Sequence, residues 1–277
     1  MPTKSTRKTA TRKAPKKSAR EPKTTALARA RQPATLVTGG TGFLGSHLVR
    51  LLVAEGAKNL RVMATSAPPW LEELGVETVR GSVTSPEDVA RAVEGVGEIY
   101  HLAGRVSRER GDAHEMYRLH VEGTRLLCEA AAAAGVTSMV MASTSGTVAV
   151  TDTGDVIPDE DWPTPLDIIS RWPYYASKVY QERVARRHFA GKNRRLVLLN
   201  PSLLLGPGDE RLSSTRVVLD FLSRKIVVVP KGGLSFVDAR DAAAPSTPRC
   251  GRAGPASATC SARPTGLSAT SSVGSNA

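Results

Sequence analysis

Three glycines that follow an apolar run constrain the fold of this chain more than any other feature. The run ATLVT at residues 34–38 leads into Gly39, Gly42 and Gly45, and an amphipathic segment then continues to residue 55. An apolar run, a glycine-rich turn and a segment with helical periodicity predict a strand, a tight turn and a helix. The helix is expected to pack closely on its strand, because Gly45 has no side chain to hold the two apart.

The same alternation of short apolar runs and amphipathic segments continues to residue 200. This order is typical of βαβ units, which build a parallel sheet covered by helices on both faces. We therefore predict an α/β fold with a doubly wound, Rossmann-type parallel sheet. The predicted strands are 34–38, 60–64, 76–80, 98–103, 138–143 and 195–200, and the predicted helices are 43–55, 86–95, 114–134 and 174–190.

The two ends of the chain differ in composition from its middle. Residues 1–33 hold almost no aliphatic side chains, so they are predicted to be a disordered basic tail. Residues 201–244 keep one helical pattern near 215–222 and two short apolar runs. Residues 245–277 are rich in small and polar residues without periodicity, so they are predicted to be a low-complexity, unstructured tail.

The formal charge of +12 comes from the ends of the chain. Residues 1–31 carry 11 Lys and Arg against one acid, Glu21, whereas residues 32–244 carry 24 basic and 25 acidic residues. The body of the protein is therefore electrostatically ordinary, and nucleic acid is expected to bind only non-specifically, through the basic tail. A solvated tail without function and an organelle transit peptide are the alternatives.

Cysteines, histidines and apolar runs exclude several classes of protein. The three cysteines form no CxxC pair and the five histidines have no metal-ligand spacing, so neither a disulfide framework nor a metal site is expected. The sequence has no apolar run of 18 residues, and no apolar stretch follows the basic start as in a secretory signal. We therefore expect a soluble, cytoplasmic protein without a membrane segment.

The glycine turn has a use in binding phosphate groups. Gly39 permits the tight turn, Gly42 lets a pyrophosphate approach the backbone, and the N-terminus of the following helix faces the phosphates. At the first βα junction of a parallel sheet, this geometry predicts that a dinucleotide binds there. Residues 34–200 are therefore the predicted dinucleotide-binding domain, and residues 201–244 are a partial substrate-binding region.

Two further groups of residues suit proton transfer. Tyr174 and Lys178 are four residues apart on a predicted helix, so they share one face, and an adjacent ammonium favours the phenolate of a tyrosine. Ser143 and Thr144 follow a predicted strand at the carboxyl edge of the sheet, where a hydroxyl can donate to a substrate oxygen. A helix cap is the alternative role for these hydroxyls.

Five motifs in this order resemble the extended short-chain dehydrogenases/reductases, also called the NAD-dependent epimerase/dehydratase family. The resemblance covers residues 34–244 and is greatest to the branch of dihydroflavonol reductases and sugar epimerases. It implies a Rossmann fold and an enzyme that uses a nicotinamide dinucleotide. The motifs are TGGTGFLG at 38–45, YHLAG at 100–104, HVEGT at 120–124, YYASK at 174–178 and NPSLLLGPGD at 200–209.

The resemblance also implies roles for individual residues. Tyr174 is the expected acid/base, and Lys178 is expected to lower its pKa and to bind the cofactor ribose. Thr144 is expected to polarise the substrate oxygen, with Ser143 as the fallback. The implied cofactor-binding residues are Gly39, Gly42, Phe43, Leu44, Gly45, Thr65, Ser82, Leu102, Ala103, Ser143, Lys178, Asn200, Pro201 and Ser202.

Several positions depart from the family pattern. His120 stands where the family has Asn, and Ser82 stands where an Asp often meets the adenine. Thr65 and Ser66 occupy the place of an acid that would bind the ribose 2′-hydroxyl. Without that carboxylate a 2′-phosphate is not repelled, so NADP is slightly favoured over NAD. Arg61 is the nearest arginine that could bind such a phosphate.

The sequence therefore predicts an oxidoreductase or epimerase that acts at a CH–OH or C=O centre of a small molecule or sugar nucleotide. Tyr174 and Lys178 would assist hydride transfer to or from the nicotinamide. The alternative is a catalytically impaired dinucleotide-binding or scaffold protein with a basic tethering arm, which His120 and Ser82 favour. The sequence separates neither a reductase from an epimerase or dehydratase nor a monomer from a homodimer.

The end of the chain is interpreted as truncated or frameshifted near Ala244, because family-like periodicity stops there. Residues 256–262 can be encoded so that a shifted frame reads Glu-Arg-Tyr-Leu-Leu-Gly, which resembles a strand common in this family. A natural low-complexity tail is the alternative. A frameshift would leave the C-terminal substrate lobe incomplete and an apolar face exposed.

Overall fold

The computed structural model of the chain describes residues 32–153, 158–189, 191, 193–228 and 232–244, and the backbone of residues 258–260. The predicted basic tail lies outside these residues except for Gln32 and Pro33, and so does most of the predicted tail 245–277. Over the described ranges, no helix combines the length and apolar character that crossing a membrane requires.

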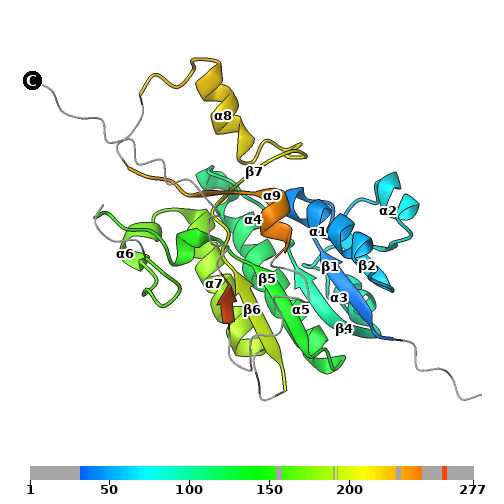
Figure 1. The fold of residues 1–277 in the computed structure, drawn as a ribbon. Helices are drawn as coiled ribbons and strands as arrows, with labels where there is room; N and C mark the ends of the chain where they lie inside the picture. The colour runs from blue at the N-terminus through cyan, green and yellow to red at the C-terminus, as the bar shows by residue number, and fades with distance from the viewer. Residues whose placement is uncertain are drawn as a thin grey trace, which may run out of the picture. The chain divides into compact units, whose positions relative to one another are not determined.

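A seven-stranded parallel sheet forms the centre of the described chain (Figure 1). Its strand order is β3-β2-β1-β4-β5-β6-β9, so the order reverses between β1 and β4. A reversal of this kind defines the doubly wound fold, which confirms the predicted α/β class. The strands are β1 Ala34–Thr38, β2 Leu60–Ala64, β3 Glu77–Arg80, β4 Val96–His101, β5 Ser138–Ala142, β6 Arg195–Leu199 and β9 Ala258–Cys260.

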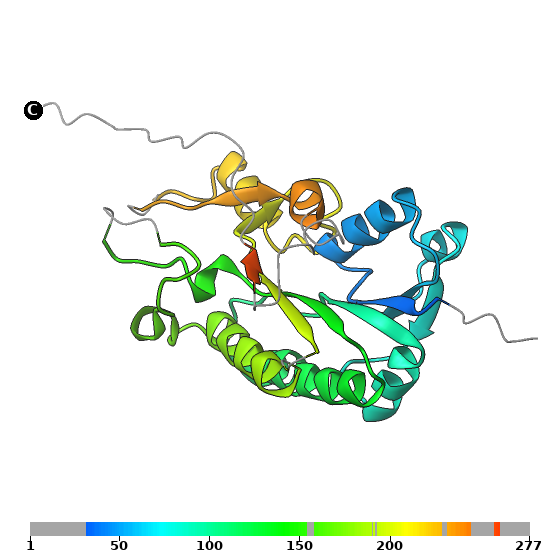
Figure 2. The same cartoon turned by 60° about the horizontal axis from the view of Figure 1, so that its bottom comes forward.

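Helices cover both faces of this sheet, as Figure 2 shows. One face carries α1 (Phe43–Ala54), α2 (Pro69–Glu73) and α9 (Ala239–Ala243), whose apolar residues form one buried cluster with the strands. The second cluster lies on the opposite face. The helices there are α3 Pro86–Val93, α4 Ala113–Tyr117, a π-helical turn Arg118–Glu122, α5 Gly123–Ala133 and α7 Pro173–His188.

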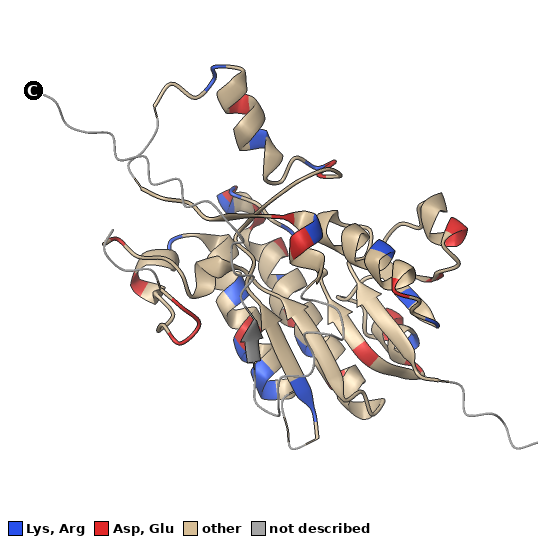
Figure 3. Ribbon diagram, viewed as in Figure 1, with Lys and Arg blue, Asp and Glu red and all other residues tan. Residues whose placement is uncertain are grey.

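Local sequence determines where these helices begin. Ser85 accepts a hydrogen bond from the backbone N–H of Asp88 at 3.2 Å, and Pro86 occupies the first turn of α3, where no N–H partner is needed. Proline also begins α7, whose last turn carries two arginines and a histidine near the negative helix end. Elsewhere in the described chain basic and acidic residues are interspersed (Figure 3), as expected for a body without excess charge.

A small second sheet follows β6. In it β7 (Leu203–Leu205) pairs in parallel with β8 (Phe236–Asp238), and α8 (Thr215–Leu222) lies between them in the chain. Asp238 caps α9 by accepting a hydrogen bond from the Arg240 N–H at 2.8 Å, and α9 packs on α1. The helix α8 has no buried residue, and its Phe221 and Leu222 side chains are exposed. The region 201–244 therefore presents apolar side chains to solvent.

The structure contains short elements that the sequence pattern does not predict. These are α2, α6 (Leu166–Ile169), β7 and β9, together with the π turn that interrupts the predicted helix 114–134. Residues 258–260 belong to the tail predicted to be unstructured, but their backbone pairs with Val197 to Leu199 of β6. Such pairing uses the free N–H and C=O groups at the edge of β6, so it requires no apolar pattern in the added strand.

Replacing Gly45 tests the close packing of α1. A Cβ on Gly45 would overlap the Gly39 carbonyl oxygen and lie 2.8 Å from Gly40 Cα, and both atoms belong to the backbone. Gly45→Ala must therefore displace α1, and we expect a loss of about 1–3 kcal/mol in the free energy of unfolding. Urea unfolding measures this loss. Gly111→Ala is the matched control, because a Cβ there meets no atom within 4 Å. Equal stability of both variants would contradict the packing.

Candidate active site

The glycine turn after β1 lies against the end of β4. Gly39 has a φ of +71°, a conformation that side chains disfavour, and a Cβ on it would lie 2.6 Å from the backbone nitrogen of Ala103. The Ala103 N–H donates to Thr38 Oγ1 at 3.3 Å, and the Leu102 N–H donates to the Thr38 carbonyl oxygen at 3.0 Å. Predicted cofactor residues from two separate strands, Gly39 with Leu102 and Ala103, are therefore neighbours.

The structure supplies a reason for glycine at position 42. Gly42 is the N-cap of α1 with an extended backbone that any residue can adopt, and a Cβ on it would meet only the Gly39 carbonyl oxygen, at 3.3 Å. Neither backbone conformation nor internal packing therefore requires glycine. A ligand that approaches the backbone at the N-terminus of α1 does require it, and the first turn of α1 contains no acid that would repel a pyrophosphate. Leu44 is buried in the core, and Phe43 packs its ring against His47.

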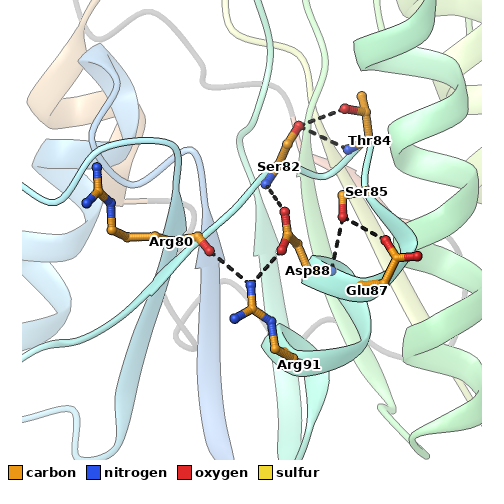
Figure 4. A network of polar contacts seen from close by, with 7 residues as sticks. All are labelled: Arg80, Ser82, Thr84, Ser85, Glu87, Asp88 and Arg91. Carbon is orange, nitrogen blue, oxygen red and sulfur yellow. Dashed lines mark hydrogen bonds and ion pairs between the residues drawn. The ribbon is translucent and has the colours of Figure 1, made fainter.

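Ser82, which the sequence places near an adenine, follows β3 within a polar network (Figure 4). Its N–H donates to Asp88 Oδ2 at 3.0 Å, and its hydroxyl accepts from the Thr84 N–H at 3.2 Å. The bond from the Ser82 backbone and the side chain of Arg91 hold the pKa of Asp88 below its ordinary value. The network fixes the turn between β3 and α3, so Ser82 has a defined position at the carboxyl edge of the sheet.

Thr65 and Arg61 do not form a common phosphate site. Thr65 is exposed immediately after β2. The Arg61 guanidinium donates to the carbonyl oxygens of Ala92 at 2.9 Å and Glu94 at 2.7 Å, and it lies 3.0 Å from the Glu77 carboxylate. Arg61 is thus engaged beside the start of β2, away from the carboxyl edge. The sequence offers no arginine replacement for the missing acid nearer than Arg61, and these contacts agree with a guanidinium that points away from the cofactor edge.

Tyr174 and Lys178 lie in the first two turns of α7, below the ends of β4 and β5. The ammonium of Lys178 is buried and donates to the Ala142 carbonyl oxygen at 3.0 Å and to Gln181 Oε1 at 2.8 Å. Burial lowers the pKa of Lys178 to about 8, and the Glu182 carboxylate opposes that change. Burial raises the pKa of the Tyr174 phenol, so the phenol is protonated at neutral pH. Among the described residues, the acceptors of the Lys178 ammonium are thus Ala142 and Gln181, and the Tyr174 phenol is not one of them.

The hydroxyls of Ser143 and Thr144 have different partners. Ser143 donates its hydroxyl proton to Glu182 Oε1, so this proton is not available to a substrate oxygen. Thr144 Oγ1 accepts from the Gly146 N–H at 3.3 Å, and the Thr144 hydroxyl is near enough to the Tyr174 phenol to lower its pKa, against the larger opposite effect of burial. Thr144 thus combines the capping role with contact to Tyr174. This geometry favours Thr144 over Ser143 as the hydroxyl beside the reacting atoms.

Sequence reasoning missed Glu182, the acceptor at the centre of this site. The side chain is buried, and its Oε1 accepts from Ser143, from Thr147 Oγ1 at 2.8 Å and from Asn200 Nδ2 at 3.1 Å. Asn200, a predicted cofactor residue, is therefore held inside the sheet edge, while the next residue, Pro201, accepts from the Ser145 N–H at 2.9 Å. The available signal was spacing, since Glu182 lies four residues after Lys178 on α7.

His120 occupies the π turn and holds the first turn of α7. Its Nε2 accepts from the Arg105 N–H at 3.0 Å, so the proton of the neutral ring must be on Nδ1, which lies 2.8 Å from Ser177 Oγ. Ser177 in turn donates to the Tyr174 carbonyl oxygen at 2.7 Å. Burial and the nearby Lys178 charge lower the pKa of His120 to about 2, so the ring stays neutral. The histidine at the family's Asn position therefore positions the helix that carries Tyr174.

The predicted site residues fall into two groups in space. Those after β1, β4, β5 and β6 converge with α7 at the carboxyl edge of the central strands, whereas Thr65 and Ser82 lie at the ends of the outer strands β2 and β3. Ser202 is half-buried after β6. Within the described residues, no group of three or more His, Cys, Asp or Glu side chains is placed to hold a metal ion. This arrangement suits an extended ligand laid across the sheet edge, with its reactive end beside Tyr174.

Comparison with known proteins supports the same interpretation. The sequence model of the "NAD dependent epimerase/dehydratase family" matches residues 35–244. The chain is 34% identical over 213 residues to "Sterol demethylase protein B" of Methylococcus capsulatus, which covers 76% of this chain and 63% of that protein. It is 35% identical over 163 residues to human "3 beta-hydroxysteroid dehydrogenase type 7", covering 56% of this chain and 44% of that protein.

A solved structure shows the same fold with ligands. "MoeE5 in complex with UDP-glucuronic acid and NAD" superposes with a TM-score of 0.67 at 26% identity, over 82% of this chain and 75% of that one. The chain spans less than two thirds of the length of both curated relatives, 63% and 44%.

Removing Glu182 is expected to destabilise the protein because the buried Ser143 hydroxyl would lose its acceptor and Thr147 and Asn200 would each lose one of theirs. We expect Glu182→Ala to lower the free energy of unfolding by at least about 2 kcal/mol. The matched control is Glu129→Ala, which removes an exposed ion pair with Arg125 and is expected to change stability little. Urea unfolding of both variants measures the difference. A Glu182→Ala protein as stable as Glu129→Ala would show that the buried hydrogen bonds do not form.

Proposed function

Because the chain belongs to the NAD-dependent epimerase/dehydratase family, we propose that it binds a nicotinamide dinucleotide and acts as an oxidoreductase or epimerase at a CH–OH or C=O centre. One observation carries this proposal: the buried Lys178, one turn after Tyr174 on α7, donates to the Ala142 carbonyl oxygen at 3.0 Å, directly before Ser143 and Thr144 at the sheet edge that holds the glycine turn. When bound there, the nicotinamide supplies or accepts the hydride.

In this proposal Tyr174 and Thr144 act on the substrate oxygen, and Lys178 and Glu182 support them. Tyr174 exchanges a proton with that oxygen, and the Thr144 hydroxyl donates a hydrogen bond to it. Because burial raises the pKa of Tyr174, the phenol is protonated at rest and acts as the acid in the reductive direction. Lys178 binds the cofactor ribose, and its ammonium stabilises the phenolate that remains after proton transfer. Glu182 keeps Ser143 and Thr147 in place around Thr144.

We propose NADP as the preferred form of the cofactor. Neither Thr65 nor Ser66 carries a negative charge that would repel a 2′-phosphate. NAD is the alternative, because it is the form bound in MoeE5 and because Arg61 is engaged elsewhere. Dissociation constants for NADPH and NADH, measured side by side on the same preparation, decide between them.

The substrate is proposed to be a small molecule or sugar nucleotide that carries a secondary alcohol or a ketone. The names of the curated relatives favour a steroid-like alcohol, and the ligand of MoeE5 favours a sugar nucleotide. Residues 145–173 and 201–244 are proposed to make this choice, because they border Thr144 and Asn200. A homodimer, a cytoplasmic location and non-specific binding of nucleic acid by the basic tail are further proposals.

A second candidate function is a dinucleotide-binding or scaffold protein without turnover. The exposed apolar side chains of α8 favour it, because a complete substrate lobe would be expected to bury them. Tight cofactor binding without reduction of any compound in a panel of ketones and sugar nucleotides would support this candidate. Turnover that depends on Tyr174 would exclude it.

Gly42→Val tests the cofactor site. The extended backbone at Gly42 accepts valine, so the protein should fold, but the added side chain would occupy the space that a pyrophosphate needs. We expect NAD(P)H binding, followed by nucleotide fluorescence, to be lost while the circular dichroism spectrum stays unchanged. Unaltered affinity in a folded Gly42→Val protein would refute the assignment of the turn.

Tyr174→Phe tests the catalytic proposal. Loss of a positioned acid/base should lower the turnover number by a factor of about 10² to 10⁴. Cofactor affinity should change little, because Tyr174 is proposed to contact the substrate. Lys178→Met should impair both quantities, since Lys178 is proposed to bind the ribose. Steady-state kinetics and nucleotide titration separate the two effects, and a Tyr174→Phe protein as active as the parent would remove Tyr174 from the mechanism.

A further inference from the structure

A buried chain of hydrogen bonds connects the glycine turn to the lysine of the site. Ala103 N–H donates to Thr38 Oγ1, which lies 2.7 Å from His101 Nδ1, and His101 Nε2 lies 2.8 Å from Thr124 Oγ1. Gln181 Nε2 donates to the same Thr124 oxygen at 3.0 Å. Gln181 Oε1 then accepts from Lys178 Nζ at 2.8 Å. The four linking side chains, Thr38, His101, Thr124 and Gln181, are all fully buried.

The orientation of the Gln181 amide follows from this chain. An ammonium can only donate, so the Gln181 oxygen must face Lys178 and the nitrogen must face Thr124. Both ends of the amide are thereby satisfied in a buried position, where an unpaired end would be costly. A buried glutamine that bonds Lys178 through an oriented oxygen is placed to control that ammonium.

The loop after β4 approaches the Lys178 ammonium at Gly104. Two of its acceptors are Ala142 on β5 and Gln181 on α7. A Cβ on Gly104 would lie 3.6 Å from Nζ, which is an ordinary contact distance, so the Gly104 backbone borders the ammonium on the side of this loop. An ammonium held by two acceptors on one side presents its remaining N–H to the other side.

We propose that Gln181 is a positioning residue for Lys178: it holds the ammonium with the Ala142 carbonyl and directs the remaining N–H toward Gly104. The part of this inference that concerns the cofactor ribose rests on the proposed function. The positioning of the lysine itself does not. Gln181 thereby links the lysine to Thr38, the residue that precedes the glycine turn.

Three other titratable groups face Lys178. Glu182 on α7 raises its pKa. His101 on β4 and His120 in the π turn feel the Lys178 charge, and burial together with that charge lowers their pKa values to about 3 and about 2. Both rings are therefore neutral from about pH 6 upward. A change at Gln181 should then act on Lys178 without interference from either histidine.

Two substitutions should move the titration of Lys178 in opposite directions. Gln181→Met keeps the length of the side chain but removes the acceptor, so the pKa of Lys178 should fall by about 1 pH unit. Gln181→Glu keeps an oxygen there and adds negative charge, so the pKa should rise by about 1 pH unit or more. The readout is the 13Cε chemical shift of lysine in the labelled, cofactor-free full chain from pH 6 to 11, with Lys178→Met to assign the signal.

Two controls separate positioning from simple structural support. Tyr180→Phe changes an exposed residue of the same helix and should leave the Lys178 titration unchanged. Thr124→Val removes the partner of the Gln181 nitrogen and should lower the pKa of Lys178 by less than Gln181→Met does. If Gln181→Met does not fold, Gln181→Glu and Thr124→Val still give opposite expected shifts. Folded variants whose Lys178 titrates as in the parent, or shifts in one common direction, would overturn the proposal.

Cofactor binding gives an independent second readout. If the ammonium bonds the ribose through a directed N–H, Gln181→Met should weaken NAD(P)H binding about threefold at pH 6.5, where Lys178 stays charged but has lost its positioning acceptor. At pH 8.5 the weakening should be about tenfold larger, because more of the lysine is also deprotonated in the variant. Failure of the parent to bind NADH and NADPH would refute the proposed function and leave the lysine titration interpretable. Unchanged affinity of the folded Gln181→Met protein at pH 6.5 would contradict the directed N–H.

Discussion

The backbone of the glycine turn contacts the backbone that follows β4. The positions of the polar side chains at this edge of the sheet depend on that contact. Gly39 leaves no space for a side chain against Ala103, and Gly45 leaves none against the turn. β1 and β4 are therefore fixed side by side at the point where the strand order reverses. At such a point the flanking helices diverge to opposite faces, which opens the edge for a ligand.

Polar groups beneath this edge are buried but almost fully paired, and their pairing explains how neighbouring residues can differ in role. Ser143 and Thr144 are adjacent in sequence, yet their hydroxyls have different partners. The Ser143 hydroxyl donates to Glu182, whereas the Thr144 hydroxyl lies near the Tyr174 phenol and lowers its pKa. Two buried histidines stay neutral and serve as fixed donors and acceptors. Among the described buried side chains of the site, Asn200 Oδ1 is without a hydrogen-bond partner, at the end of β6.

Much of the fold could be predicted because its elements have strong periodicity. The predicted bounds of β1 and β2 match the structure, and the glycine turn and α7 lie where the motifs place them. The short strands β7 and β9 could not be predicted, since a few residues form a strand only when a partner edge is available. Glu182 and Gln181 were not predicted because spacing along α7 relates both to Lys178 but does not reveal their contacts with Ser143, Asn200 and Thr124 on other elements. The π turn Arg118–Glu122 contains no glycine or proline that would distinguish it from the helical pattern around it.

The segment between Asn200 and Ala239 leaves the central sheet and is anchored to it at both ends. Asn200 is bonded to Glu182 inside the sheet edge, and α9 returns the chain to α1. The entropy lost in closing such a loop grows only with the logarithm of its length. Insertions and deletions within this segment should therefore change the stability of the central sheet little. The segment can diversify in evolution while the sheet and its glycine turn stay the same.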